Sequence, residues 1–186
     1  MKGIVFTELL ELVEEKFGYE TVDQIISAAN LENDGAFTAI GTYDHNDLLK
    51  MVVALSQQVG VPVPVLVNTF GKHLFNTFVK NYGDKISGFD SAFQLLEKVE
   101  GFIHVEVRKL YPDAELPTFE YHRPTPEQLE VTYMSTRPFA DLCEGLIQQC
   151  VAHFGEKIEI GRENLSDDGT RAKFTLVREL KTAPLN

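Results

Sequence analysis

The sequence has no tryptophan, and only two cysteines and three methionines occur among its 186 residues. Its apolar runs all fall short of the roughly 20 residues that a membrane-spanning helix needs. Positive charge is also scarce, because 17 Lys and Arg stand against 28 Asp and Glu, which gives a formal net charge of −11. An acidic surface repels phosphate backbones and anionic lipids. We therefore expect neither nucleic acid nor a membrane as a partner.

The two cysteines, Cys143 and Cys150, lie seven positions apart in a segment with helical spacing. At about 1.5 Å rise per residue, they stand roughly 10 Å apart along the helix, which is too far for a disulfide bond. Two thiols without a bridge are typical of a reducing compartment. Acidic residues follow Met1 closely, and the first residues show no small-residue cleavage site of a secretory signal. We therefore expect a cytoplasmic protein.

The order of helical and extended patterns predicts the fold class. The length suits one domain over residues 1–186. Apolar residues at helical spacing predict helices over residues 4–17, 21–30, 45–59, 65–79, 90–110 and 139–154. Alternating apolar and polar residues predict strands over residues 119–122, 129–135, 157–160 and 173–178. The result is an α+β fold, with a mostly helical N-terminal part, a four-stranded antiparallel sheet and a helix inserted between its strands.

His104 is the histidine most unlike a surface residue. It lies in the expected 90–110 helix, which Asp90 would cap and which is apolar on nearly all sides, as a buried central helix is. Taken alone, such a histidine is more often a core residue with a satisfied hydrogen bond. A single histidine can nevertheless bind haem, because the macrocycle supplies four other iron ligands. A structural metal site needs several ligands, and we find no cluster with that spacing. The other four histidines are expected at the surface or at helix margins: His45, His73, His122 and His153.

A second group of polar residues has the sequence Tyr133-Met134-Ser135-Thr136-Arg137. In an extended chain, alternate side chains point to one side, so Tyr133, Ser135 and Arg137 would form a row. All three donate hydrogen bonds, and the Arg guanidinium matches a carboxylate. Such a row suits a ligand with two carboxylates, for example the haem propionates. The alternative is a polar strand edge with Arg137 in a surface ion pair.

Other chemistry has little support in the sequence. It contains no Gly-rich phosphate loop and no Gly-x-Ser-x-Gly elbow of a nucleophilic serine. Adjacent acidic residues such as Glu14 and Glu15 are typical of a solvated surface, and no pair of carboxylates suggests acid–base catalysis. We therefore predict that the protein is not an enzyme.

Taken together, these motifs resemble the haem nitric oxide/oxygen binding (H-NOX) family along nearly the whole chain. The resemblance includes the opening Met1-Lys2-Gly3-Ile4 and the His104 helix continuing through Val105-Glu106-Val107-Arg108-Lys109-Leu110-Tyr111. It also includes the Leu116-Pro117 step, the Tyr133-x-Ser135-x-Arg137 motif and Glu144-Gly145-Leu146. The resemblance implies a haem b (iron protoporphyrin IX) buried between a distal part, about residues 1–63, and a proximal part, about residues 64–186.

The resemblance also implies residue roles. His104 would be the axial iron ligand, and Tyr133, Ser135 and Arg137 would hold the propionates. Pro117 would press on the macrocycle and contribute to its distortion. Oxygen-binding relatives carry a distal tyrosine where this chain has Leu142, with supporting positions that correspond to Leu74 and Leu9. Two further apolar residues, Val5 and Phe78, would complete the distal pocket.

An apolar distal pocket favours particular gases. Bound O2 carries partial negative charge and gains from a hydrogen-bond donor, whereas NO on ferrous iron needs one far less. The resemblance therefore implies a five-coordinate ferrous haem that binds NO and CO with little or no O2. Some relatives hold zinc in a C-terminal Cys/His cluster, but residues 158–174 contain neither Cys nor His, so no zinc is expected.

The resemblance finally implies a signalling role. Binding of NO would weaken the iron bond to His104 and let the two parts of the domain shift. The chain leaves no room for an output domain, so a separate histidine kinase or a cyclic di-GMP synthase or phosphodiesterase would read the change. Two alternatives are a haem carrier or store without signalling, and a binder or enzyme for another hydrophobic ligand.

Overall fold

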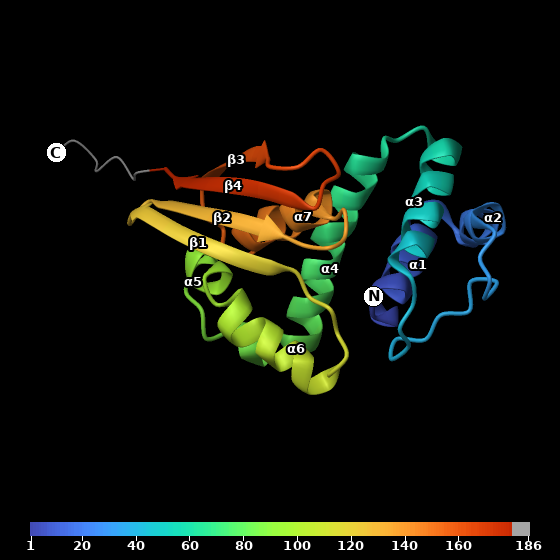
Figure 1. Ribbon diagram of the computed structural model, residues 1–186, viewed down its shortest axis with the longest axis horizontal. Coiled ribbons are helices and arrows are strands. Elements are labelled where there is room, and N and C mark those ends of the chain that lie inside the picture. The colour runs from blue at the N-terminus through green and yellow to red at the C-terminus, as the bar shows by residue number, and fades with distance from the viewer. Residues whose placement is uncertain (180–186) are drawn as a thin grey trace.

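The computed structural model describes residues 1–179, which form seven α-helices, one π-helical turn and a four-stranded sheet (Figure 1). The helical elements are α1 (Gly3–Phe17), α2 (Tyr19–Ala29), α3 (His45–Val59), α4 (Val63–Ile86), α5 (Ala92–Leu96), η1 (Val99–Ile103), α6 (His104–Leu110) and α7 (Ala140–His153). The strands are β1 (Thr118–Thr125), β2 (Gln128–Met134), β3 (Ile158–Asn164) and β4 (Arg171–Arg178). This architecture confirms the predicted α+β fold.

The first three helices form a small bundle that packs against the first half of α4. Each helix turns an apolar stripe toward a shared core, in which Phe6, Leu48 and Met51 are fully enclosed. The Asp44 side chain begins α3 by accepting a hydrogen bond at 3.0 Å from a first-turn backbone N–H. Gly60 ends the helix in the left-handed region, at φ +71°. Asp44 and Gly60 thus fix where α3 begins and where it ends.

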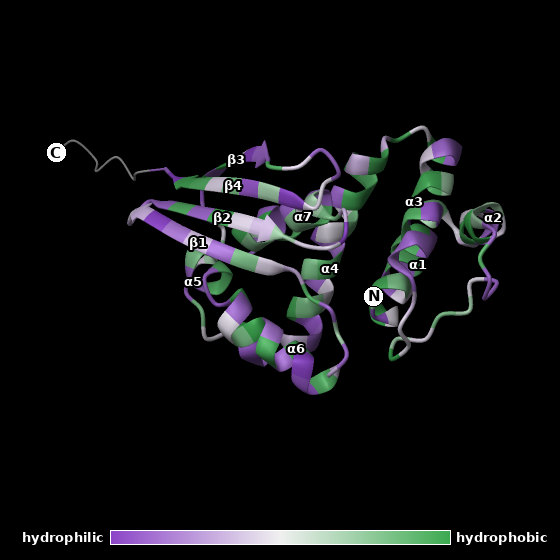
Figure 2. Cartoon of the chain, in the orientation of Figure 1, coloured by the Kyte–Doolittle hydropathy of each residue, from purple (hydrophilic) through white to green (hydrophobic). Residues whose placement is uncertain are grey.

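The sheet forms the second part of the molecule, with strand order β1-β2-β4-β3 and antiparallel pairing throughout. Hydropathy alternates along the strands (Figure 2), and every second residue of β2 and β4 is buried. The buried face packs against α5 and α7 around a second core that includes Phe93 and Phe174. The predicted strands are confirmed in order and in their antiparallel arrangement, and β1 runs from Thr118 to Thr125, three residues past the predicted end at His122.

Helix α4 lies between the bundle and the sheet (Figure 1) and contributes to both cores. It crosses α7 at two glycines: a Cβ on Gly145 would lie 2.0 Å from the carbonyl oxygen of Asn68, and a Cβ on Gly71 would lie 2.3 Å from that of Leu142. The helix also runs to Ile86, well past the predicted end at Val79. It continues because Ile86 is anchored in the second core, with a local break in helical geometry at Tyr82. The division near residue 63 stays a prediction.

The expected helix over residues 90–110 is wrong as a single element. Ser91, and not Asp90, caps α5 by accepting a hydrogen bond from the backbone of Gln94. The helix breaks at Lys98, and the chain resumes as η1 and then α6. This segment packs against its neighbours from one side only, so Phe102, Val105 and Leu110 remain exposed, and His104 is the buried residue of α6.

Within residues 1–179, no single helix combines the length and apolar composition of a membrane span; α3 and α4, which meet at 115°, pass that test only as a bent pair.

Candidate haem site

A cavity of about 350 Å³ lies where the N-terminal bundle, α4, α7, the sheet and the η1–α6 segment converge. Its volume is within the range of small-molecule and cofactor sites. Its wall is almost entirely apolar, with a few polar side chains at defined places. The predicted site residues that line it are Val5, Leu74, Phe78, His104, Pro117, Tyr133, Ser135, Arg137 and Leu142. The fold therefore brings together residues that are more than 130 positions apart in the chain.

One part of the cavity wall consists of hydrocarbon side chains from three helices. Val5 comes from α1, Leu74 and Phe78 come from α4, and Leu142 comes from α7. None of these side chains can donate a hydrogen bond. Leu9 was expected beside them, but it is not among the cavity-lining residues; it lies buried in the core of the N-terminal bundle.

His104 begins α6, and its imidazole lies at the cavity wall with 7% of the residue exposed. Its ring packs beside that of Phe119 on β1, with 5.8 Å between the ring centroids. The Nδ1 atom is buried and has no hydrogen-bond partner, although Oε1 of Glu100 lies 3.3 Å away outside hydrogen-bonding direction. Burial lowers the pKa of His104, and the nearby Glu100 carboxylate opposes this effect. The neutral imidazole, which is the metal-binding form, is therefore favoured.

The polar row does not continue as a strand, because β2 ends at Met134 and the backbone bends through residues 136–138. Its three side chains nevertheless converge on the cavity. The Tyr133 hydroxyl donates to the carbonyl oxygen of Arg137 at 3.2 Å, and the Ser135 hydroxyl accepts from the Arg137 backbone N–H at 3.1 Å. Burial raises the pKa of Tyr133 to about 12, so its hydroxyl stays a donor.

The Arg137 guanidinium already binds a carboxylate. It donates from Nη1 to the carbonyl oxygen of Glu115 at 3.0 Å and forms an ion pair with the side chain of the same residue. The Arg137 side chain is only 13% exposed, whereas that of Glu115 is 76% exposed. An ion pair with so exposed a partner is weak, so Glu115 can give way to another carboxylate.

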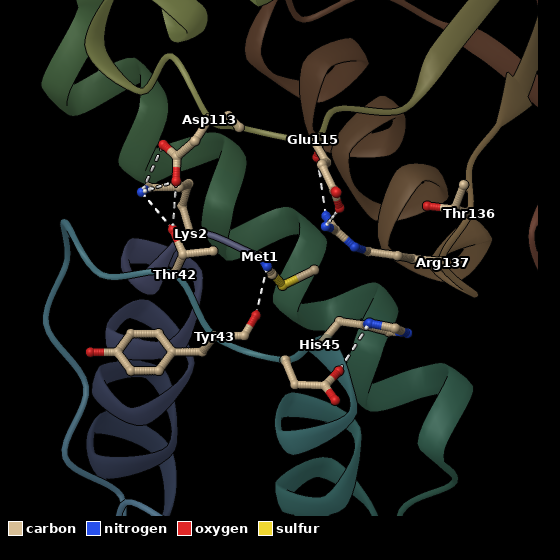
Figure 3. A pocket seen from close by; sticks show the side chains of 11 residues that line it. Met1, Lys2, Thr42, Tyr43, His45, Asp113, Glu115, Thr136 and Arg137 are labelled. Carbon is tan, nitrogen blue, oxygen red and sulfur yellow. Dashed lines mark hydrogen bonds and ion pairs between the residues drawn. The ribbon is translucent and has the colours of Figure 1, made fainter.

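A second, polar pocket of about 340 Å³ adjoins the cavity and shares Arg137 and Glu115 with it (Figure 3). At its edge, Lys2 donates to Thr42 at 2.8 Å and to the Asp113 carboxylate at 3.2 Å, and Thr42 also donates to Asp113 at 2.9 Å. These bonds tie the start of the chain to the segment between α6 and β1. The polar pocket thus forms a charged mouth beside an apolar interior.

The residues present fit a haem. A flat apolar macrocycle matches the apolar cavity, a neutral buried imidazole matches an iron ligand, and a cation with hydroxyl donors at the polar mouth matches two propionates. Pro117 lines the same wall as His104. The roles assigned to these residues stay predictions.

Sequence reasoning missed several cavity residues. Phe119 and Tyr121 line the wall from β1, and the period of two in that strand could have identified them, since they follow Pro117 by two and four positions. Tyr82 was missed because α4 was expected to end before it. Glu100 does not line the cavity, but its carboxylate lies beside the imidazole of His104.

The two cysteines lie in α7 with free thiols, and both line the cavity. Burial raises the pKa of Cys143, and it raises that of Cys150 to about 12, so both thiols stay protonated and unreactive. Across residues 1–179, no three His, Cys, Asp or Glu side chains are grouped to hold a metal ion. The absence of zinc stays a prediction.

The remaining histidines have local partners. His45 lies 3.3 Å from the Asp44 carboxylate, His73 lies 3.0 Å from that of Glu8, and His122 lies 3.2 Å from that of Glu130. His153 packs on Phe75 and Phe154. His73 is less exposed than expected, because α4 turns this position toward α1.

Comparison with known proteins agrees with this geometry. The sequence model of the family described as Haem-NO-binding matches residues 2–162. The solved structure of the Fe(II) unliganded H-NOX protein from K. algicida is 39% identical, with coverage of 98% of this chain and 99% of that chain and a TM-score of 0.92. That of the H-NOX from Shewanella woodyi in the Fe(II)CO ligation state is 42% identical, with coverage of 98% and 97% and a TM-score of 0.83.

A more distant structure has the same fold. The H-NOX protein from S. oneidensis in the Fe(II)NO ligation state is 25% identical, with coverage of 97% of this chain and 100% of that chain and a TM-score of 0.88. A search of curated proteins gave no match. Because the family match covers most of the sequence and relatives near 40% identity share the fold over nearly their full length, this chain belongs to the Haem-NO-binding, or H-NOX, family.

Proposed function

We propose that this protein is a haem-based nitric oxide sensor. The observation that carries the proposal is the buried imidazole of His104, whose Nδ1 has no hydrogen-bond partner, on the wall of an apolar cavity. When bound there, haem b supplies a ferrous iron with one coordination position open to a diatomic gas. His104 would hold the iron, and Tyr133, Ser135 and Arg137 would hold the propionates.

The gas selectivity follows from the hydrocarbon wall. Val5, Leu74, Phe78 and Leu142 offer no hydrogen-bond donor to a gas, and a donor is what O2 requires more than NO or CO does. Four tyrosines also line the cavity: Tyr121 and Tyr133 on β1 and β2, Tyr111 just after α6, and Tyr82 on α4 at the break in its helical geometry. None of them belongs to α1, to α7 or to the stretch of α4 before that break, where the four hydrocarbon side chains lie. The protein should therefore bind NO and CO in preference to O2.

Signalling would use the position of His104 at the first residue of α6. If the bond between His104 and the iron were lost, α6 and the segment after it would be free to move. That segment contains Asp113, whose carboxylate accepts hydrogen bonds from Lys2 and Thr42. A gas would thus bias the relative position of the two cores, and a bistable element of this kind is what signalling needs. The output partner would be a histidine kinase or an enzyme that makes or degrades cyclic di-GMP.

The absorption spectrum of the ferrous protein under argon, NO, CO and air tests the proposal. We expect a five-coordinate haem under argon, distinct shifts with NO and CO, and no O2 complex in air. A protein that takes up no haem would contradict haem binding. The protein would instead be a haem carrier if it binds haem but if adding NO does not change the activity of any candidate kinase or cyclic di-GMP enzyme.

Leu142→Tyr should increase the affinity for O2. The change places a hydroxyl donor on the hydrocarbon wall of the cavity, where the Leu142 side chain now lies. Spectra recorded during O2 titration measure the effect. Leu142→Phe is the matched control, because it adds a ring of similar size without a donor. Equal O2 binding in the two variants would contradict the placement of Leu142 beside the gas.

A further inference from the structure

We propose that Glu100 is a positioning residue for His104: its carboxylate polarises the Nδ1–H of the imidazole and thereby strengthens the bond that the opposite nitrogen makes to iron. The inference rests on the proposed function, because it assigns a role toward a bound haem. It concerns two residues four positions apart: His104, at the junction between η1 and α6, and Glu100, inside η1.

The contact is held from both sides. Oε1 of Glu100 lies 3.3 Å from Nδ1 of His104, and the same oxygen accepts a hydrogen bond at 2.9 Å from the backbone N–H of Phe119. The Phe119 ring packs beside the imidazole. The carboxylate is thus fixed between η1 and β1, with this oxygen 3.3 Å from the imidazole Nδ1.

The imidazole needs such a partner. Nδ1 is a buried ring nitrogen without a hydrogen bond, and an unsatisfied buried polar atom is costly. A small rotation of the ring or of the carboxylate would convert the 3.3 Å approach into a hydrogen bond. Among residues 1–179, Glu100 supplies the carboxylate that lies within 4 Å of a His104 ring nitrogen, and no other carboxylate does so.

The π-helical turn creates this arrangement. Within it the backbone N–H groups of Ile103 and His104 bond to the carbonyl oxygens of Lys98 and Val99, five residues earlier. The wider turn places Glu100 at the side of His104 that faces β1. Single π turns inside helical segments often occur at functional sites.

The chemical consequence follows from the two imidazole nitrogens. When a carboxylate accepts the Nδ1 proton in a hydrogen bond, that nitrogen stays protonated and Nε2 is left to bind metal with greater basicity. A more basic His104 resists release from iron. Glu100 would therefore set how readily gas binding breaks the bond between His104 and the iron. The positive charge of Arg108 has the opposite effect on His104, because it lowers the basicity of the imidazole.

A purely structural role for Glu100 is the competing explanation, because its carboxylate already satisfies the N–H of Phe119. Glu100→Gln separates the two roles. The amide keeps an acceptor oxygen for Phe119 but removes the negative charge. Glu97→Gln is the matched control, since Glu97 lies one turn earlier and pairs with Arg123 at 2.9 Å.

The experiment uses the haem-loaded full chain of the wild type, Glu100→Gln and Glu97→Gln. Resonance Raman spectra of the ferrous five-coordinate state report the iron–histidine stretch. We expect the band to move to lower frequency in Glu100→Gln only, with haem lost to a scavenger about 10-fold faster. Thermal unfolding should show equal stability of the two apo variants.

The outcomes are distinguishable. An unchanged iron–histidine band in Glu100→Gln would overturn the positioning role and leave the proposed function standing, whereas a wild type without haem would overturn the proposed function itself. If Glu100→Gln does not fold, proton NMR of the wild-type CO complex decides instead. A His104 Nδ1–H resonance far downfield of an ordinary imidazole N–H supports the charged hydrogen bond, and an ordinary shift contradicts it.

Discussion

His104→Gly should abolish the five-coordinate ferrous haem spectrum, and added imidazole should restore it. The substitution removes the imidazole that lies at the cavity wall and leaves room for a free imidazole in its place. The fold should persist, because a glycine at the first position of a helix costs little compared with the loss of a ligand. Absorption spectra with and without imidazole measure the effect.

His73→Gly is the matched control for this change. His73 also lies on a helix near an acidic partner, at 3.0 Å from Glu8, but it does not line the cavity. Its spectrum should equal that of the wild type. A His104→Gly protein with an unchanged ferrous spectrum would show that another side chain binds the iron.

Gly145→Ala should destabilise the protein by about 1–3 kcal/mol, the usual cost of overpacking a core. The new Cβ would meet the Asn68 carbonyl oxygen at 2.0 Å and the Cα of Gly71 at 3.1 Å. Both are backbone atoms, so α4 and α7 must move apart. The melting temperature should fall by roughly 2–12 °C for a chain of this length, as measured by thermal unfolding of the haem-loaded protein.

Gly83→Ala provides the contrast, because a Cβ there has no atom within 4 Å. In an open helical position the same change should stabilise by as much as about 1 kcal/mol. A loss of stability in Gly145→Ala together with a gain in Gly83→Ala would show that the effect arises where α4 and α7 cross. A Gly145→Ala protein as stable as the wild type would mean that α4 and α7 can separate without cost.

Most of the fold could be predicted from the sequence because its elements carry clear periodic patterns. Every second residue of β2 and β4 is apolar and buried, so the strands and their sheet could be anticipated. Two features could be singled out because such side chains are rare in apolar or extended surroundings: His104, and the row of Tyr133, Ser135 and Arg137. Their convergence on one cavity depends on contacts across the whole chain.

The errors have physical causes in tertiary structure. Residues 90–110 contain apolar side chains on all sides, which predicts one buried helix, but part of this apolar surface faces the cavity and part remains exposed. Neither Gly nor Pro stands at the break, at Glu97 and Lys98, so the sequence gives no sign that the helix ends there. Leu9 was expected near the cavity from the family resemblance, but it is buried in the core of the N-terminal bundle and does not line the cavity.

The π turn of η1 sets the spacing between the Glu100 carboxylate and the His104 imidazole. Its five-residue hydrogen bonds hold one residue more than an ordinary α-helical turn does. Deletion of Gly101, whose surroundings are open, would let this segment take up ordinary α-helical winding with one residue fewer, so the residues after it would keep nearly the same direction. The spacing between Glu100 and His104 would fall from four positions to three, so the winding of this turn, as well as the two residue types, decides how the carboxylate meets the imidazole.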